Sequence, residues 1–320
     1  MAANTWNGLI CVCKEAGYTS SDVVARLRGI LKQKKIGHTG TLDPQAVGVL
    51  VVCLGSATRV TDLLTEHDKE YIATVQLGVT TDTQDMTGEI LSRGDVSRVT
   101  RQSLTTALQA FKGTYDQIPP MYSAVRVGGK HLYELARKGQ VVERKPRSVT
   151  IHAISLLDDS TLAEHGVFTM EVKCSRGTYI RTLCNDIGER LGCGAAMAQL
   201  TRTSVGSFRL EDALTLERIE QLRDEGTLAE HILPVENLFR DLAPVCVSPE
   251  LRKKMENGNS FRPEEIVDDS PEGEDDPWQP QESYTEGERV RAYCSGDWFG
   301  VYRYSSRRQT FDVEKFFYIP

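Results

Sequence analysis

The segment Gly-His-Thr-Gly-Thr-Leu-Asp-Pro at residues 37–44 constrains this chain more than any other, because it places two glycines, a histidine and one carboxylate side by side. Glycine permits left-handed or tightly curved backbone close to a ligand. Pro44 fixes its own φ and disfavours helical backbone at Asp43. We therefore predict a rigid loop that aims the Asp43 carboxylate. The same letters also fit a plain glycine-rich turn ending in Asp-Pro, so the choice depends on the rest of the chain.

The composition is that of an ordinary globular protein. A length of 320 residues, with 40% hydrophobic and 26% charged, indicates about two domains. No run approaches the roughly 18 apolar residues of a membrane span, and the start of the chain lacks the basic region of a signal peptide. The eight cysteines form no CxxC pair, so neither a metal site nor a disulfide scaffold is indicated. We expect a cytoplasmic protein with reduced thiols and no membrane contact.

The net charge of −7 is concentrated at one end of the chain. Residues 1–245 carry 28 Lys and Arg against 29 Asp and Glu, whereas residues 246–320 carry 10 against 16. The segment 264–288 alone holds eleven carboxylates, three prolines and no cation, which is typical of a solvated loop. It lacks the ligand spacing of a calcium loop. Such a segment repels phosphate, so a nucleic-acid-binding face would have to lie elsewhere.

Hydrophobic periodicity predicts a mixture of strands and helices. Ser20, Ser21 and Asp22 can cap the helical pattern that follows them. Strands and helices do not alternate as strict βαβ units, so we predict an α+β fold with a mixed, largely antiparallel sheet and flanking helices. Neither GxGxxG nor GxxxxGK[ST] is present, which argues against a nucleotide cofactor. The strands are expected at 8–13, 71–77, 149–156 and 167–174, and the helices at 23–31, 103–111 and 178–191.

A second candidate site lies in Cys-Ser-Arg-Gly-Thr-Tyr-Ile-Arg at residues 174–181. Here a strand is expected to pass to a helix through Gly177, with Thr178 as the cap, which puts Arg181 in the first helical turn. A cation at that end opposes the helix dipole by about 0.3–1 kcal/mol, so it needs a carboxylate or phosphate partner. An arginine beside a carboxylate keeps that carboxylate ionised and oriented. The alternative is a solvated arginine on an ordinary helix.

Two further segments supply aromatic and basic groups. Tyr71, in Asp-Lys-Glu-Tyr, begins a predicted strand, where it could stack on an unpaired base or simply fill the core. The sequence Pro-Pro-Met-Tyr-Ser-Ala at 119–124 is followed by a basic stretch that could hold phosphates or form a solvated face. Its members are Arg126, Lys130, His131, Tyr133, Arg137, Lys138, Arg144, Lys145 and Arg147.

Four motifs in this order, GHTGTLDP, DKEY, IPPMYSA with GGKHLYELAR, and CSRGTYIRTL, closely resemble the TruB family of tRNA pseudouridine synthases. The resemblance runs from about residue 7 to 208. It implies that Asp43 is the catalytic aspartate and Arg181 its ion-pair partner. It also implies that Tyr71 and Tyr179 surround the target nucleotide and that Leu200 lies near the active site. The residues expected to contact RNA are His38, Thr39, Arg59, Arg126, Lys130, Arg144 and Arg147.

The resemblance implies an isomerisation of uridine to pseudouridine, usually at uridine 55 in the T-loop of tRNA. Uracil leaves its ribose, turns and rejoins through C5. An ionised Asp43 could attack C1′ as a nucleophile or remove a sugar proton to form a glycal, and both routes stay open. The nucleotide must be flipped out, which costs a few kcal/mol. No metal or other cofactor is expected.

One motif departs from the family pattern. Many members have Asp-Lys-Pro near the N-terminus, where this chain has Cys13-Lys14-Glu15. The motif is thought to support the active-site loop. We therefore expect Lys14 to keep that role, whereas the missing proline leaves the local rigidity in question.

The tail suggests a second domain, with the catalytic domain at 1–243 and a smaller one at 244–320. Three strand-like alternations, at 290–294, 298–304 and 310–316, resemble the small β-barrel PUA domain of bacterial relatives. That domain binds the acceptor side of tRNA, and the acidic segment 264–288 would be a long loop within it. Arg303, Arg307 and Arg308 could contact phosphate or form a solvated hairpin tip.

Two other functions remain to be weighed. A non-catalytic RNA-binding protein on the same scaffold would not need Asp43 and Arg181 together. A guide-dependent synthase acting on ribosomal RNA shares the core, but such relatives tend to carry basic tails, and here the C-terminal region is acidic. We expect a tRNA-modifying enzyme with no obligatory protein partner.

Overall fold

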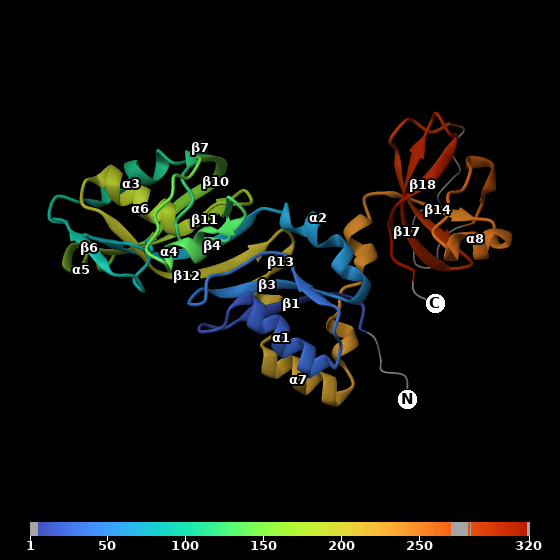
Figure 1. Cartoon of the computed structure of the whole chain (residues 1–320), viewed down its shortest axis with the longest axis horizontal. Helices are drawn as coiled ribbons and strands as arrows, with labels where there is room; N and C mark the ends of the chain where they lie inside the picture. Colours follow the sequence, from blue (N-terminus) through green and yellow to red (C-terminus); the bar gives the residue numbers. More distant parts are fainter. Residues whose placement is uncertain (1–5, 270–280, 282, 319–320) are drawn as a thin grey trace.

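The computed structural model describes residues 6–269, 281 and 283–318, which fold around two main β-sheets (Figure 1). The larger sheet and its helices fill the left and centre of Figure 1, and the smaller sheet stands at the upper right. No helix within these ranges is both long and apolar enough to cross a membrane.

The larger sheet contains the strands β1 (Gly8–Lys14), β2 (Ile36–His38), β3 (Val47–Leu54), β4 (Lys69–Leu77), β7 (Gly113–Gln117), β10 (Arg147–Asp158), β11 (Val167–Cys174), β12 (Ala195–Val205) and β13 (Phe208–Arg209). Their spatial order is β1-β3-β12-β4-β11-β10-β7, with β13 beside β12 and β2 beside β3. Only β12 and β3 pair in parallel among these described strands. The predicted mixed, largely antiparallel sheet is confirmed.

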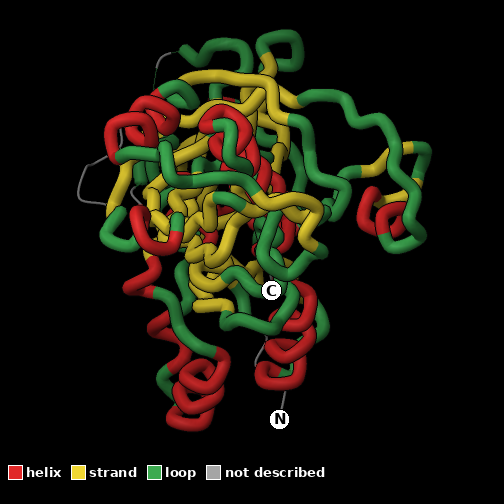
Figure 2. Tube along the Cα trace, turned by 90° about the vertical axis from the view of Figure 1, so that its left-hand side faces the viewer, coloured by secondary structure: helices red, strands yellow, loops and turns green. Residues whose placement is uncertain are grey.

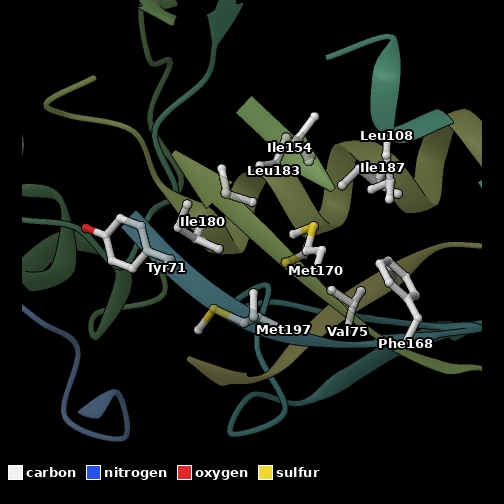
Figure 3. Packing of buried hydrophobic residues seen from close by; sticks show 14 of the residues in the cluster. Tyr71, Val75, Leu108, Ile154, Phe168, Met170, Ile180, Leu183, Ile187 and Met197 are labelled. Carbon is white, nitrogen blue, oxygen red and sulfur yellow. The ribbon is translucent and has the colours of Figure 1, made fainter. Parts of the chain in front are cut away.

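Helices cover different faces of the two halves of this sheet. Below its right half in Figure 1 lie α1 (Ser20–Leu31) and α7 (Leu216–Glu225), and above its left half lie α3 (Arg101–Gln109) and α6 (Ile180–Leu191). Figure 3 shows how α6 packs its apolar face against β4, β10 and β11 in a core of Val75, Ile154, Met170, Leu183 and Ile187. The short helices are α2 (Thr61–Thr65), α4 (Leu132–Ala136), α5 (Leu162–His165) and α8 (Arg252–Glu256).

The start of α1 differs by one residue from the prediction. Thr19 is the N-cap, because its hydroxyl accepts the Asp22 N–H while the Asp22 carboxylate accepts the Thr19 N–H, which forms a capping box. Ser20 begins the helix instead. Its side chain is buried and faces inward, where its hydroxyl can bond to another segment of the chain.

An arm at residues 118–146 projects from the body. It carries the short hairpin of β8 (Arg126–Val127) and β9 (Lys130–His131), followed by α4. Figure 2 shows this arm at the right, held away from the main sheet. A small apolar cluster of Met121, Leu132 and Leu135 gives it a core of its own. A second short hairpin, β5 (Val79–Thr81) with β6 (Ile90–Arg93), follows β4.

The smaller sheet has the order β15-β14-β16-β17-β18 and contains the three predicted tail strands. Its strands are β14 (Ala243–Val247), β15 (Ile266–Val267), β16 (Arg289–Cys294), β17 (Asp297–Ser305) and β18 (Thr310–Phe316). An isolated bridge joins Phe261, in the segment before β15, to Phe311 of β18, but within the described residues β15 and β18 do not pair into a closed barrel.

The smaller sheet packs against the larger body through aromatic side chains. The rings of Trp298 and Phe317 stack at 4.8 Å and lie on Phe239. Part of the acidic segment expected at 264–288, namely residues 270–280 and 282, lies outside the described residues. At its described beginning, Glu265 pairs with Lys254 at 3.2 Å.

Candidate active site

The loop of residues 37–44 joins β2 to β3 and is anchored to the body at its middle. The Leu42 N–H donates to the Ser20 hydroxyl at 2.9 Å, at the first residue of α1. The Thr39 N–H donates to the Val51 carbonyl at 3.1 Å. These bonds attach the loop both to a helix and to its own neighbouring strand, so its backbone has little freedom.

Lys14 anchors the end of the same loop. Its buried ammonium donates to the carbonyl of Pro44 at 3.0 Å and to that of Glu15 at 2.9 Å. The Gly17 N–H donates to the same Pro44 carbonyl at 2.9 Å. Burial lowers the pKa of Lys14 to about 8, although the nearby Asp43 carboxylate opposes this. Lys14, the middle residue of the motif that differs from Asp-Lys-Pro, therefore contacts the loop at Pro44, the residue after Asp43.

The glycines of this loop do not use the left-handed backbone that glycine permits. Neither Gly37 nor Gly40 has a positive φ. A Cβ at Gly37 would lie 3.7 Å from Thr58, and one at Gly40 would lie 3.5 Å from an Arg202 nitrogen, which are ordinary contacts. The loop takes its shape from the bonds that hold it, and glycine is not demanded there by backbone strain.

Asp43 and Arg181 form a two-point ion pair across the sheet. Nε of Arg181 lies 2.8 Å from Oδ2 of Asp43, and its Nη2 lies 3.2 Å from Oδ1. The remaining N–H groups donate to the carbonyls of Thr83 at 3.1 Å and Tyr122 at 2.9 Å. The Arg181 side chain is only 6% exposed, whereas that of Asp43 is 36% exposed. The guanidinium is thus enclosed and bonded through all three of its nitrogens, and the carboxylate keeps an open side.

Asp85 is a second carboxylate beside Arg181 that the sequence did not reveal. Its Oδ2 lies 3.6 Å from Nη1 of Arg181, and the Asp85 side chain is 15% exposed. Its other oxygen accepts hydrogen bonds from the hydroxyl of Thr83 and the N–H of Thr87. The sequence signal that could have indicated an ordered carboxylate here is the run of Thr and Asp after β5, because such side chains stabilise tight turns.

Burial is the largest influence on Asp43 and raises the pKa of its carboxyl. The Arg181 guanidinium opposes that rise, and the negative charge of Asp85 adds to it. Two neighbours of opposite sign therefore adjust one carboxyl. Asp43 is the group in this cluster that a substrate could reach, since Arg181 is almost wholly enclosed.

Arg202 supports the loop from beneath and was also missed. It is 2% exposed, and it donates from Nε to the Val49 carbonyl at 2.7 Å and from Nη2 to the Gly40 carbonyl at 3.2 Å. Its positive charge opposes the rise that burial causes in the pKa of the Tyr71 phenol. Alternation along β12 puts position 202 on the inward side with Leu200, so an arginine at a core position was the available signal.

Tyr71 and Leu200 both lie in the main core cluster next to the loop. Tyr71 is 9% exposed, and burial raises the pKa of its phenol. Figure 3 shows its ring at the end of the cluster, with the hydroxyl directed away from Met170 and Val75. Leu200, 7% exposed, lies opposite Ala73 on β4.

Tyr179 is half-buried at the N-cap position of α6, two residues before Arg181. The prediction that Thr178 caps this helix was wrong. The Thr178 hydroxyl donates back to the Ser175 carbonyl at 2.9 Å, and α6 begins only at Ile180, with no side-chain bond from its own N-cap.

His38 and Thr39, two predicted RNA contacts, lie at the end of β2 with different exposure. His38 is half-buried, its Nδ1 has no hydrogen-bond partner among the described residues, and burial lowers its pKa. Thr39 is 2% exposed, and its carbonyl accepts the Thr65 hydroxyl at 2.8 Å. The Thr39 side chain therefore faces the body of the protein.

Arg59 is exposed but is already engaged with the smaller sheet. Its guanidinium donates to the carbonyl of Phe316, and its own carbonyl accepts the Lys315 ammonium at 3.2 Å. Arg59 thus joins the two sheets.

The remaining predicted RNA contacts lie on or beside the arm. Arg126 and Lys130 are exposed on its hairpin, and Arg147 is exposed where β10 begins. Arg144 is half-buried and donates to the Pro119 carbonyl at 3.1 Å. Three of these four cations therefore face solvent. Among the described residues, no group of three or more His, Cys, Asp or Glu side chains is arranged to hold a metal ion.

Two family models match the chain in succession. Residues 28–180 match the N-terminal domain of TruB family pseudouridylate synthases, and residues 181–240 match the tRNA pseudouridylate synthase B C-terminal domain. The first match includes both Asp43 and Tyr71, and the second begins at Arg181.

Similar proteins span most of the chain. It is 48% identical over 316 residues to tRNA pseudouridine synthase B of Lachnoclostridium phytofermentans, covering 97% of this chain and 99% of that protein. It is also 48% identical over 260 residues to the protein of that name from Staphylococcus saprophyticus, covering 80% and 85%.

Solved structures with a similar fold come from RNA–protein assemblies. An H/ACA RNP bound to a substrate RNA containing 2'-deoxyuridine includes a chain with a TM-score of 0.66 and 25% identity, covering 98% of this chain and 85% of that one. A chain of a Cbf5-Nop10-Gar1 complex gives a TM-score of 0.67 and 26% identity, covering 97% and 85%.

Proposed function

The chain belongs to the TruB family of pseudouridine synthases, and we infer that it isomerises uridine to pseudouridine in tRNA, with uridine 55 of the T-loop as its target. The observation that carries the proposal is the two-point pair of Asp43 and Arg181. A merely RNA-binding protein has no need for a partly open carboxylate held by an enclosed arginine.

Asp43 is the proposed catalytic residue. As a nucleophile its carboxylate would bond to C1′ while the N-glycosidic electron pair leaves with uracil. As a base it would take the proton from C2′, and the C1′=C2′ double bond of a glycal would form as uracil leaves with the N-glycosidic electron pair. In both routes uracil turns and C5 bonds to C1′. In the first route this breaks the bond between Asp43 and C1′, and in the second C2′ takes back its proton from Asp43; the C5 proton is then lost and N1 of uracil gains one. Both routes begin with an ionised Asp43, and Arg181 favours that form.

The surrounding side chains suit a flipped nucleotide. Tyr71 presents its hydroxyl end at the edge of the core, and Tyr179 lies at the start of the helix that carries Arg181. We assign these two rings and Leu200 to the walls of the nucleotide pocket. Contact with such walls offsets the few kcal/mol needed to remove a base from its stack. His38, on the strand that leads into the loop, is proposed to contact the RNA.

The arm is proposed to hold the T stem-loop by its backbone. Arg126, Lys130 and Arg147 expose cations there, and recognition of a folded RNA relies on shape and phosphate contacts. Arg144 contributes by stiffening the base of the arm through Pro119. The proposed roles of Thr39 and Arg59 are indirect, because one is buried and the other contacts the smaller sheet.

For the smaller sheet we propose a PUA-like domain at 244–320 that contacts the acceptor side of tRNA, with the synthase domain at 1–243. Its five-stranded sheet, the bridge between Phe261 and Phe311, and its aromatic core support this. Binding of full-length tRNA and of an isolated T stem-loop would be compared. Equal affinity for the two would contradict an acceptor contact. A cytoplasmic location, where tRNA is abundant, belongs to the same proposal.

The test of the main function is a position-resolved map of pseudouridine in an unmodified tRNA transcript incubated with the protein alone. We expect product at uridine 55 and none in a transcript with cytidine there. No product from folded protein would contradict the function, and product only on addition of a guide RNA would favour the guide-dependent class. Asp43→Asn should bind tRNA yet lose at least about a thousandfold in rate. Activity within about tenfold of wild type would remove Asp43 from its role.

A further inference from the structure

Gln117, at the end of β7, has a fully enclosed side-chain amide. Both the oxygen and the nitrogen of this amide bond to the backbone of one residue, Tyr179. The Gln117 side chain is 1% exposed. Oε1 accepts the Tyr179 N–H at 2.8 Å, and Nε2 donates to the Tyr179 carbonyl at 3.1 Å. Nε2 also donates to the Tyr115 hydroxyl at 2.6 Å. The amide is thus oriented by three bonds.

This contact fixes the N-cap residue of α6 from outside the helix. Tyr179 is the N-cap residue of α6, and its side chain accepts no bond from the helix. The first N–H groups of a helix have no partner within it, and polar side chains normally satisfy them or hold the preceding residue in place. Here Gln117 holds the N-cap backbone from the neighbouring strand. The first turn of α6, which carries Arg181, is positioned by that bond.

The segment that follows Gln117 meets the same helix again. The Tyr122 carbonyl accepts from Nη2 of Arg181 at 2.9 Å, the nitrogen that also donates to Asp43. Residues 117–122 therefore form a strap that touches the start of α6 at its backbone and at its arginine. The arm with its exposed cations continues directly from this strap.

We propose that Gln117 is a positioning residue for the reaction: it holds Tyr179 and, through the first turn of α6, the Arg181 guanidinium in line with Asp43. This rests on the proposed function. Gln117 touches no substrate and acts through the residues it holds. Small displacements of catalytic groups lower rates strongly, by up to about a hundredfold for about 1 Å.

The chain offers a closely matched control. Gln33 makes the same pair of bonds to the backbone of Trp6, accepting its N–H at 2.7 Å and donating to its carbonyl at 2.9 Å, in the lobe of α1. Gln33→Ala and Gln117→Ala each remove an amide that bonds to one residue at both ends. Only the second removal affects the start of α6.

The experiment measures single-turnover rate, tRNA affinity and the pH dependence of the rate for wild type, Gln117→Ala, Gln117→Glu and Gln33→Ala. If wild type makes no pseudouridine, the proposed function fails. If wild type is active, the comparison among the variants tests this inference alone. For Gln117→Ala we expect a rate about 10- to 100-fold lower than that of wild type and a tRNA affinity within about threefold of it. The acid limb, which is the fall of the rate toward low pH, should move to higher pH, because a displaced Arg181 no longer lowers the pKa of Asp43.

Gln117→Glu keeps the acceptor for the Tyr179 N–H and can accept from the Tyr115 hydroxyl, so its rate should lie between those of wild type and Gln117→Ala. Gln33→Ala should match wild type in rate and pH dependence. The proposal is overturned if Gln117→Ala, folded, turns over within about twofold of Gln33→Ala. It is also overturned if its acid limb stays in place while affinity alone falls.

Discussion

Nε of Arg181 lies 2.8 Å from Oδ2 of Asp43, although 138 residues separate them along the chain. The contact joins a loop between β2 and β3 to the first turn of α6, on the other half of the sheet. The pair therefore depends on the residues that hold this loop and this helical turn in place.

Replacing Arg181 should move the acid limb of the rate upward in pH. The reactive form of Asp43 is the carboxylate, burial raises the pKa of that carboxyl, and Arg181 opposes the rise. In Arg181→Met the opposition is lost, so the carboxyl protonates at higher pH. The loss of rate should therefore be greater at about pH 6 than at about pH 8. Arg181→Lys, which keeps the charge, should shift the limb less. An unshifted limb in Arg181→Met would contradict this coupling.

Asp85→Asn should move the acid limb of the rate to lower pH. The Asp85 charge raises the pKa of Asp43, so its removal lowers that pKa and extends activity to more acidic pH. The amide oxygen can still accept from Thr87, so the turn should persist and the rate at about pH 8 should fall by about tenfold at most. A limb that shifts upward would show that Asp85 acts only through the position of Arg181. Measurement of rate against pH for Arg181→Met and Asp85→Asn together tests the opposite signs.

Lys14 should make stability rise with pH in an alkaline window. Burial lowers its pKa from the ordinary 10.5 to about 8 in the folded chain. Between these values the unfolded chain binds more protons than the folded one, so the free energy of unfolding increases with pH. The shift corresponds to roughly 3 kcal/mol. Wild type should gain about that much relative to Lys14→Met between about pH 8 and about pH 10.5.

Urea unfolding at both ends of the window measures this difference. Lys112→Met, at an exposed position, serves as the control and should show no such trend relative to wild type. A constant difference between wild type and Lys14→Met would mean that the buried amine keeps its ordinary pKa.

Arg202→Met should destabilise the fold and loosen the catalytic loop. The guanidinium serves the carbonyls of Val49 and Gly40, and a buried acceptor that loses its donor costs about 1–3 kcal/mol. We expect a loss of about 2–4 kcal/mol in the free energy of unfolding, with a lower rate even where the variant remains folded. Arg218→Met, at an exposed ion pair on α7, should change stability by less than about 1 kcal/mol. An equally stable Arg202→Met would show that the cost of burying the cation exceeds the value of its bonds.

Local patterns predicted the elements well where short-range periodicity decides them. The alternation of β4 and the start and end of β18 were found at or close to their positions. The helix ends were predicted less accurately. Thr19 bonds to Asp22 and caps α1, whereas Thr178 bonds back to Ser175 and does not cap α6.

The candidate site was partly accessible from sequence. The family resemblance paired Asp43 with Arg181, whereas the residues by themselves indicated only that an arginine in a first helical turn needs a carboxylate or phosphate partner. Asp85, Arg202 and Gln117 were not found, because the contacts that link them to the site, with Arg181, Gly40 and Tyr179 respectively, are with groups far away along the chain. No local rule links such positions.

The sequence by itself determined the periods of the strands and helices, the residue types of the loop and the motif order that marks the family. These depend on each residue and its near neighbours, which the chain specifies directly. Only the tertiary structure decided that the Lys14 ammonium bonds to the Pro44 carbonyl, that a buried Arg202 bonds to the Gly40 carbonyl, and that Arg181 also bonds to the Tyr122 carbonyl. Such contacts need both partners to be desolvated and oriented together, which happens only once the sheet has brought distant segments to one place.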